Sequence, residues 1–187
     1  DFVPIKNLFN EWFAKDTSRK IKAAFRAKYL AGDHVFTHAP LGYKKDPDNK
    51  CHLLIDDETK WIVERIFNLA LAGAGASKIQ RILVNENIPT PAWLNFQRYG
   101  TWAHVFEGQP ENKRYDWGIS QIKKILSDQV YLGHSVHYRD TKVSFKSKKR
   151  IHTTKDKWLI VENTHEPIIS EDVFCEVQKI IDQRRRP

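Results

Sequence analysis

The stretch from Asn7 to Ala31 contains neither proline nor glycine, and Gly32 follows it directly. An uninterrupted stretch that ends at a glycine predicts one long helix, because glycine favours the C-terminal cap. At about 1.5 Å per residue, this helix would be about 37 Å long. The sequence therefore predicts a chain organised around a long N-terminal helix.

The predicted helix carries a basic stripe on one side. At about 100° per residue, the stripe contains Lys15, Arg19, Lys22 and Arg26. The opposite side carries Phe13, Ile21, Ala24 and Phe25. No acidic residue lies between Thr17 and Leu30, whereas a solvated helix surface usually mixes Glu with Lys. We interpret the stripe as a surface for a polyanion, and an ordinary solvated helix face is the alternative.

The net charge of +8 is concentrated in two segments. Residues 15–28 contain six basic residues and one acid, and residues 135–157 contain eight basic residues and two acids. Basic clusters suit nucleic acid, because each neutralised phosphate releases condensed counterions. A generic basic surface remains the other interpretation.

Several other classes of protein have little support in the sequence. The apolar runs are too short for a transmembrane helix, and the first residues do not form a signal peptide. Cys51 and Cys175 belong to no CxxC or CxH pair, and the histidines lack metal-ligand spacing. We expect a cytoplasmic protein with no cofactor, metal, membrane or small-molecule partner.

Composition shifts predict three parts: a long helix in residues 1–31, an extended linker in residues 32–50 and a domain in residues 51–187. The linker contains Gly32, Pro40, Gly42 and Pro47. In the domain, apolar spacing predicts helices over residues 56–72, from Ser77 to before Pro89, over 118–127 and after Ser170. Ser77 with Gln80 fits a capping box.

The intervening segments predict β structure. Residues 130–138 and 141–147 alternate around Arg139 and Asp140, which predicts a hairpin, and residues 158–162 fit a further strand. The long connection over residues 88–116 is expected to be functional or to hold a small hairpin of its own. The expected fold is α+β: a long helix followed by a helix-turn-helix-like domain with a small antiparallel sheet.

The helix at 118–127 is the candidate reading helix. Ile119, Ile122, Ile125 and Leu126 can face a core, which leaves Ser120, Gln121, Lys123, Lys124 and Ser127 outward. Gln pairs with adenine edges, Lys with guanine or phosphate, and Ser with either. An ordinary solvated helix would show the same residues.

Five strings, in order, resemble the large serine recombinases of bacterial mobile elements. They are NEWFAKDTSRKIKAAFRAK at 10–28, APLGYKKDPDNK at 39–50, the run from Ile55 through IVERIF to IPTP at 88–91, the helix from Trp117 to Leu126 with YLG at 131–133, and HEPIIS at 165–170. The resemblance covers nearly the whole chain. It implies a recombinase domain that binds DNA, joined by a long helix to a resolvase-like catalytic domain. The end of that catalytic domain and the connecting helix would then occupy residues 1–31.

The resemblance also implies a chemistry that this segment lacks. The family cleaves DNA through a serine in an arginine-flanked motif, and no serine here matches that motif. We therefore expect no enzyme activity from this chain alone and a longer parent that is a site-specific recombinase of a mobile element. Arg19 is similar in position to an active-site arginine of related resolvases. The expected partners are double-stranded DNA and other recombinase subunits.

The residues expected to contact DNA come from four segments. They are Lys15, Arg19, Lys22 and Arg26 on the long helix, Thr37, His38, Lys44 and Lys45 in the linker, Ser120, Gln121 and Lys124 on the reading helix, and Lys146, Lys148, Lys149 and Arg150 beside the hairpin. Two alternatives stay open at this point. Residues 55–127 would also suit a stand-alone helix-turn-helix transcriptional regulator. Trp93, Tyr99 and Trp102 could serve a single-strand or RNA binder as stacking platforms.

Overall fold

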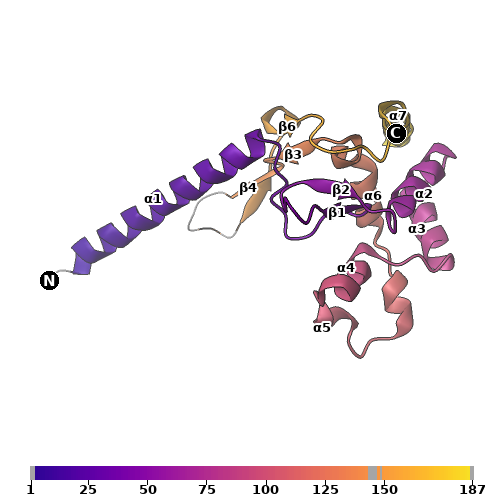
Figure 1. Ribbon diagram of the computed structural model, residues 1–187, viewed down its shortest axis with the longest axis horizontal. Coiled ribbons are helices and arrows are strands. Elements are labelled where there is room, and N and C mark those ends of the chain that lie inside the picture. Colours follow the sequence, from indigo (N-terminus) through magenta and orange to yellow (C-terminus); the bar gives the residue numbers. More distant parts are fainter. Residues whose placement is uncertain (1–2, 143–146, 148, 186–187) are drawn as a thin grey trace.

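The computed structural model describes residues 3–142, 147 and 149–185 of the 187-residue chain. Helix α1 (Val3–Leu30) extends away from a body formed by the following residues (Figure 1). The prediction of a long N-terminal helix is confirmed. The helix ends before Gly32, which has a φ of 81°. A Cβ atom there would lie 2.7 Å from the Thr164 Cγ2 atom, so this position requires glycine.

The apolar side of α1 is not covered by the body. Phe13 is 70% exposed and Ile21 is 51% exposed, and Phe9 and Trp12 are exposed as well. The helix contacts the body through its C-terminal end, where the ring of Tyr29 stacks on that of His137 with centroids 3.8 Å apart. The direction of α1 therefore depends on this end.

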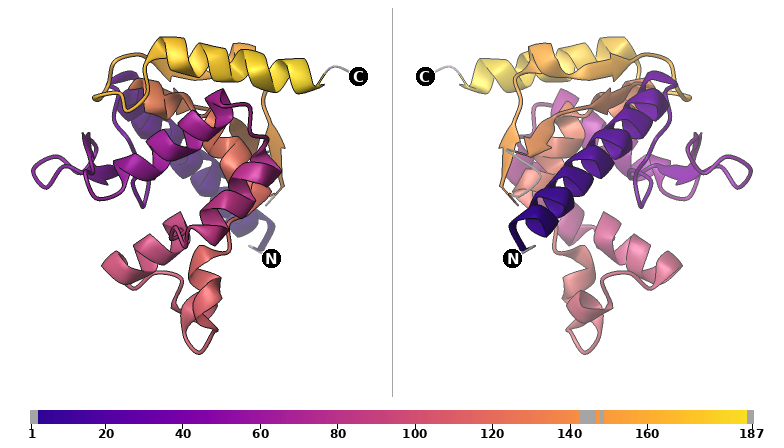
Figure 2. Two further views of the ribbon diagram at one scale, coloured as in Figure 1. Left: turned by 90° about the vertical axis from the view of Figure 1, so that its right-hand side faces the viewer. Right: turned by 90° about the vertical axis from the view of Figure 1, so that its left-hand side faces the viewer.

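Four helices enclose the core of the body: α2 (Lys60–Leu71), α3 (Ala76–Asn85), α6 (Ile119–Ser127) and α7 (Glu171–Arg185). Helix α2 packs against α3, α6 and α7, and α3 also packs against α6. Helix α7 lies along the edge of the body opposite α5 (Figure 2). The predicted apolar stripe of α2 is buried, including Val63, Ile66 and Phe67. The helix periodicity in the sequence therefore predicted this core.

Two details at the helix starts differ from the predictions. Helix α3 begins at Ala76 with Gly75 at its N-cap and no side-chain cap bond, so the capping box at Ser77 is wrong. Ile119 is 41% exposed and does not enter the core, because Trp117, just before α6, fills this end of the core. The indole N–H of Trp117 donates to the Ile88 carbonyl at 2.8 Å.

The long connection over residues 88–116 is helical and holds no hairpin. It contains α4 (Pro91–Tyr99), α5 (Ala103–Phe106) and the short 3-10 helix η1 (Glu111–Tyr115). We call residues 91–115 the helical arm. The arm projects from the end of the body opposite α7 (Figure 2). Thr90 caps α4 by accepting from the Trp93 backbone N–H at 3.2 Å, a cap that favours helix over hairpin.

Within the residues that the structure describes, the strands form three separate antiparallel pairs. These are β1 (Tyr43–Lys45) with β2 (Leu53–Ile55), β3 (Ser135–His137) with β6 (Leu159–Val161), and β4 (Asp140–Lys142) with β5 (Arg150–His152). The strand expected at 158–162 is confirmed as β6. The hairpin expected around Arg139 is wrong, because Tyr138, with a φ of 61°, separates β3 from β4 and each strand takes a different partner. Residues 143–146 of that expected hairpin lie outside the described residues.

The segment 32–50, expected to be an extended linker, contributes to the body. Tyr43 on β1 is buried in the core, and its hydroxyl donates to the Glu166 carbonyl at 2.9 Å. Burial of the Tyr43 ring thus holds β1 against the body. The division of the chain into residues 1–31, 32–50 and 51–187 stays a prediction.

A buried cluster of polar side chains ties this segment to the end of the chain. We call His34, Ser135, Thr164 and His165 the polar joint. The Ser135 hydroxyl lies 2.9 Å from His34 Nε2, and His34 Nε2 lies 3.2 Å from His165 Nδ1. Thr164 Oγ1 lies 2.9 Å from His165 Nδ1, and His165 Nε2 lies 2.7 Å from the Val130 carbonyl, to which it donates. These contacts link three segments that are distant in the sequence.

Burial keeps the histidines around the polar joint neutral. It lowers the pKa of His34 to about 3 and that of the neighbouring His137 to about 4. Burial also lowers the pKa of His165. Each pKa lies below the value of about 6.5 for an unfolded histidine, so the unfolded chain binds more protons below that pH.

We predict that the free energy of unfolding decreases by about 1–2 kcal/mol between pH 7.5 and pH 5, measured by urea titration. This window lies above the range in which carboxylates titrate, so histidines dominate it. His34→Gln should reduce this pH dependence, whereas His104→Gln, at an exposed position, should leave it unchanged. An unfolding free energy that is the same at both pH values would contradict the prediction.

Candidate nucleic-acid interface

A groove of about 1010 Å³ runs along one side of the body. Its walls come from the end of α1, residues 34–41, one face of α6 and the strands β3, β4 and β5. Four of the residues expected to contact DNA line it: His38, Gln121, Lys124 and Arg150. The fold therefore brings together candidates from three distant segments.

A second groove, of about 740 Å³, adjoins the first. It lies between residues 37–39, β1 and the C-terminal end of α4, and His38 and Ala39 line both grooves. The expected DNA contacts Thr37, Lys44 and Lys45 line this second groove. We call the two the large groove and the small groove.

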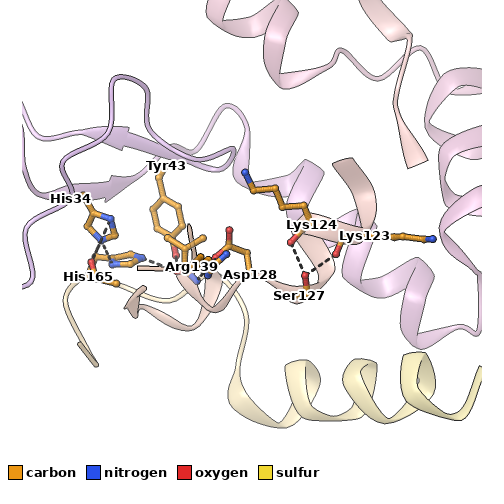
Figure 3. A network of polar contacts seen from close by, with 10 residues as sticks. His34, Tyr43, Lys123, Lys124, Ser127, Asp128, Arg139 and His165 are labelled. Carbon is orange, nitrogen blue, oxygen red and sulfur yellow. Dashed lines mark hydrogen bonds and ion pairs between the residues drawn. The ribbon is translucent and has the colours of Figure 1, made fainter. Parts of the chain in front are cut away.

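Helix α6 presents its polar residues to different sides. Lys124 lines the large groove, whereas Lys123 points to the other side of the helix (Figure 3). The Ser127 hydroxyl proton is not available to a ligand, because the hydroxyl donates to the Lys123 carbonyl at 2.9 Å. Ser120 is exposed but lines neither groove. The part of α6 that faces the groove is therefore narrower than expected.

Arg139 is a groove residue that the site prediction did not include. Its guanidinium donates to Asp128 Oδ1 at 2.7 Å and lies 5.2 Å from the centre of the Trp158 ring. Its Nε atom is buried and has no hydrogen-bond partner among the described residues. The sequence indicated Arg139 only through its place in the basic segment 135–157. No sequence pattern indicated that Arg139 would pair with Asp128.

The basic segment beside the strands is described only in part. Arg150 on β5 is exposed and lines the large groove. Lys149 is exposed but lines neither groove, and Lys146 and Lys148 lie outside the described residues. Asp140, the acid on the facing strand, pairs with His152. The described part of the basic segment 135–157 thus places two arginines, Arg139 and Arg150, in the large groove.

The basic stripe of α1 does not line either groove. Lys15, Arg19, Lys22 and Arg26 are all exposed along the projecting helix. Asp16 pairs with Lys20 at 2.9 Å and with Arg19 at 3.4 Å, and the hydrogen bond from Lys20 lowers the pKa of Asp16. The stripe is therefore partly neutralised near Arg19 and is a separate surface from the grooves.

The small groove contains acids as well as lysines. Arg98 on α4 donates to Asp56 and to Glu58, at 2.6 Å in each case. Burial of Asp56 raises its pKa, but hydrogen bonds from Arg98 and Thr59 outweigh this effect and keep the pKa below its usual value. Asp57 pairs with Lys60 at 2.7 Å. These three acids therefore have cationic partners of their own, whereas Asp46, which also lines the groove, has none among the described residues.

The aromatic residues of the helical arm divide into two groups. Trp93 packs against Phe96 and Phe106, with ring centroids 5.3 Å apart in both pairs, so it is no free stacking platform. Tyr99 and Trp102 are exposed. The idea of three stacking platforms is therefore wrong for Trp93, whose ring fills the core of the arm.

Three further features of the described residues concern metal sites, membrane spans and cysteine thiols. No group of three or more His, Cys, Asp or Glu side chains within them is placed to hold a metal ion. None of their helices is long and apolar enough to span a membrane. Cys51 and Cys175 are both free thiols.

Comparison with known proteins identifies relatives of this chain. Residues 57–184 match the protein family described as "Recombinase". The uncharacterized protein YefB of Bacillus subtilis (strain 168) is 30% identical over 104 residues, which are 56% of this chain and 30% of YefB. The chain thus spans less than a third of that relative.

Two solved structures share the fold. One is described as "Crystal Structure of a LSR-DNA Complex"; it has a TM-score of 0.57 at 17% identity, over 89% of this chain and 39% of the other. The second, "Sequence Requirements of the Listeria innocua prophage attP site", has a TM-score of 0.53 at 18% identity, over 86% of this chain and 51% of the other. A resolvase-type catalytic domain is not evident within this chain. The chain belongs to the Recombinase family and carries the recombinase domain of the large serine recombinases.

Proposed function

We propose that this chain binds double-stranded DNA in a sequence-specific manner, as part of a serine-type site-specific recombinase that acts with other subunits of its kind. The observation that carries the proposal is the convergence of His38, Gln121, Lys124 and Arg150 on the large groove. These residues come from residues 34–41, α6 and β5, and each can donate a hydrogen bond to DNA.

Within this proposal the residues have different tasks. Gln121 and Lys124 contact base edges, because they occupy the groove-facing side of α6. Arg139 and Arg150 contact phosphates. The segment after α1 follows the adjacent minor groove of the DNA, because an extended segment can lie there. Its expected contacts are Thr37, His38, Lys44 and Lys45. Three further lysines of the strand region, Lys146, Lys148 and Lys149, would add backbone contacts.

The projecting helix α1 extends the proposed interface. Its basic stripe of Lys15, Arg19, Lys22 and Arg26 would hold the phosphate backbone beyond the body. Strand cleavage would come from a catalytic domain outside this chain, with Arg19 as a candidate contributor to that active site. The solved relative described as an LSR–DNA complex supports DNA as the ligand. No observation specifically favours a stand-alone regulator.

We predict that the chain binds a 30-bp duplex of mixed sequence at about 50 mM salt, measured by fluorescence anisotropy. The logarithm of the affinity should fall linearly with the logarithm of the salt concentration, with a slope of about −0.9 per phosphate contacted. Selection from a random duplex pool should yield a preferred sequence. Absence of binding at low salt would overturn the proposed function.

We predict that Lys124→Ala weakens binding to the selected duplex by about 1–3 kcal/mol, because it removes a contact inside the large groove. Lys123→Ala is the matched control, since the two lysines are neighbours on α6 but point to different sides (Figure 3). It should change affinity by less than about 0.5 kcal/mol. Equal losses in the two variants would show that α6 does not bind DNA through its groove-facing side.

A further inference from the structure

Tyr99, the last residue of α4, is exposed for 56% of its surface although it is a large aromatic residue. Its ring stacks on that of His38, with centroids 5.5 Å apart and an angle of 30° between the planes. Both residues line the small groove, and His38 also lines the large groove. Tyr99 therefore stands at the border of the surface proposed to bind DNA.

The helical arm does not need Tyr99 for its own stability. Its core consists of Trp93, Phe96 and Phe106, and the rings of Phe96 and Phe106 lie 5.4 Å apart. The guanidinium of Arg114 covers the other side of this cluster, 4.6 Å from the centre of the Trp93 ring. The ring of Tyr99 faces the groove instead of this core.

The end of α4 is fixed to the body next to Tyr99. The preceding residue, Arg98, holds both Asp56 and Glu58 at 2.6 Å, and the Asp56 side chain is only 4% exposed. Gly100, in the left-handed region with a φ of 66°, ends the helix directly after Tyr99. A tyrosine held in this way can bind a partner with little loss of conformational entropy.

The charges of the small groove suit a phosphate backbone beside Tyr99. Four acids line the groove. Asp56 and Glu58 are paired with Arg98, and Asp57 is paired with Lys60. The fourth, Asp46, accepts a hydrogen bond from the Asp48 backbone N–H at 2.9 Å and has no ion pair among the described residues. In contrast, Lys44, Lys45 and Lys50 line the groove without an ion pair among the described residues. Lys45 donates one hydrogen bond to the Phe36 carbonyl, which leaves two of its three donors.

We propose that the helical arm is a second DNA-binding element, in which Tyr99 packs against a deoxyribose or base edge while Lys44 and Lys50 hold the flanking phosphates. This inference rests on the proposed function and extends the duplex interface from α6 to an arm whose aromatic residues the sequence suggested only as stacking platforms for single strands or RNA. Arg98 acts as a positioning residue that fixes the end of α4. The ligand is duplex DNA, continuous with the segment in the large groove.

The test is the affinity of the whole chain for the 30-bp mixed-sequence duplex. Tyr99→Ala should weaken binding roughly tenfold, the effect of losing one well-packed aromatic contact. Tyr99→Phe should stay within about twofold of the parent chain, because the ring carries the contact. Trp102→Ala is the matched control, because Trp102 is equally exposed on the same arm but lines neither groove. It should also stay within about twofold.

The outcomes separate this inference from the proposed function. If the parent chain binds duplex and Lys124→Ala weakens it while Tyr99→Ala does not, the arm does not contact DNA and this inference alone fails. If the parent chain does not bind duplex, the proposed function itself fails. An equal loss for Tyr99→Ala and Trp102→Ala would also overturn the inference, as would a Tyr99→Ala loss confined to single-stranded DNA.

Cross-linking provides a readout that does not depend on stability. A photoreactive p-benzoylphenylalanine in place of Tyr99 should cross-link to the labelled duplex, whereas the same group in place of Trp102 should not. Cross-linking from both positions or from neither would contradict the assignment. The thermal unfolding of Tyr99→Ala should match that of the parent chain, because the ring is not part of the core of the arm.

Discussion

The walls of the large groove depend on the polar joint. His34 enters from the segment after α1, Ser135 from β3, and Thr164 and His165 from the segment before α7. Buried polar groups are tolerated only when they are hydrogen-bonded, so these four side chains must meet in one arrangement. That arrangement fixes residues 34–41 beside α6 and β3, and it thereby forms the wall of the large groove.

The distribution of paired and unpaired charge defines the candidate interface more sharply than net charge does. Asp128 is occupied by Arg139, Asp140 by His152, and Asp56 and Glu58 by Arg98. The carboxylates of Asp56, Glu58 and Asp128, which would repel phosphates, are thus neutralised by arginines within the protein. The lysines of β1 keep free donors at the rim, where a polyanion can reach them.

The helices were more predictable than the strands. Apolar residues three and four apart identified α2, α6 and α7, because one buried face is enough to define a helix. The strands are three residues long, and β3 pairs with β6 across more than twenty intervening residues. Alternation over such short segments does not specify a partner, so the predicted hairpin at Arg139 was wrong. The sequence predicted a connection over residues 88–116 because prolines and glycines lie at the ends of its short helices.

By itself, the sequence determined that the chain has a long basic helix, an amphipathic helical core and an ordered set of strings similar to the large serine recombinases. The helix and the core are local properties, since they follow from composition and periodicity, whereas the strings carry a resemblance. Only the tertiary structure decided that Lys124 faces the groove while Lys123 does not, and that Tyr99 lies beside His38. Such choices depend on contacts between segments distant in the chain, where packing and buried hydrogen bonds select one arrangement.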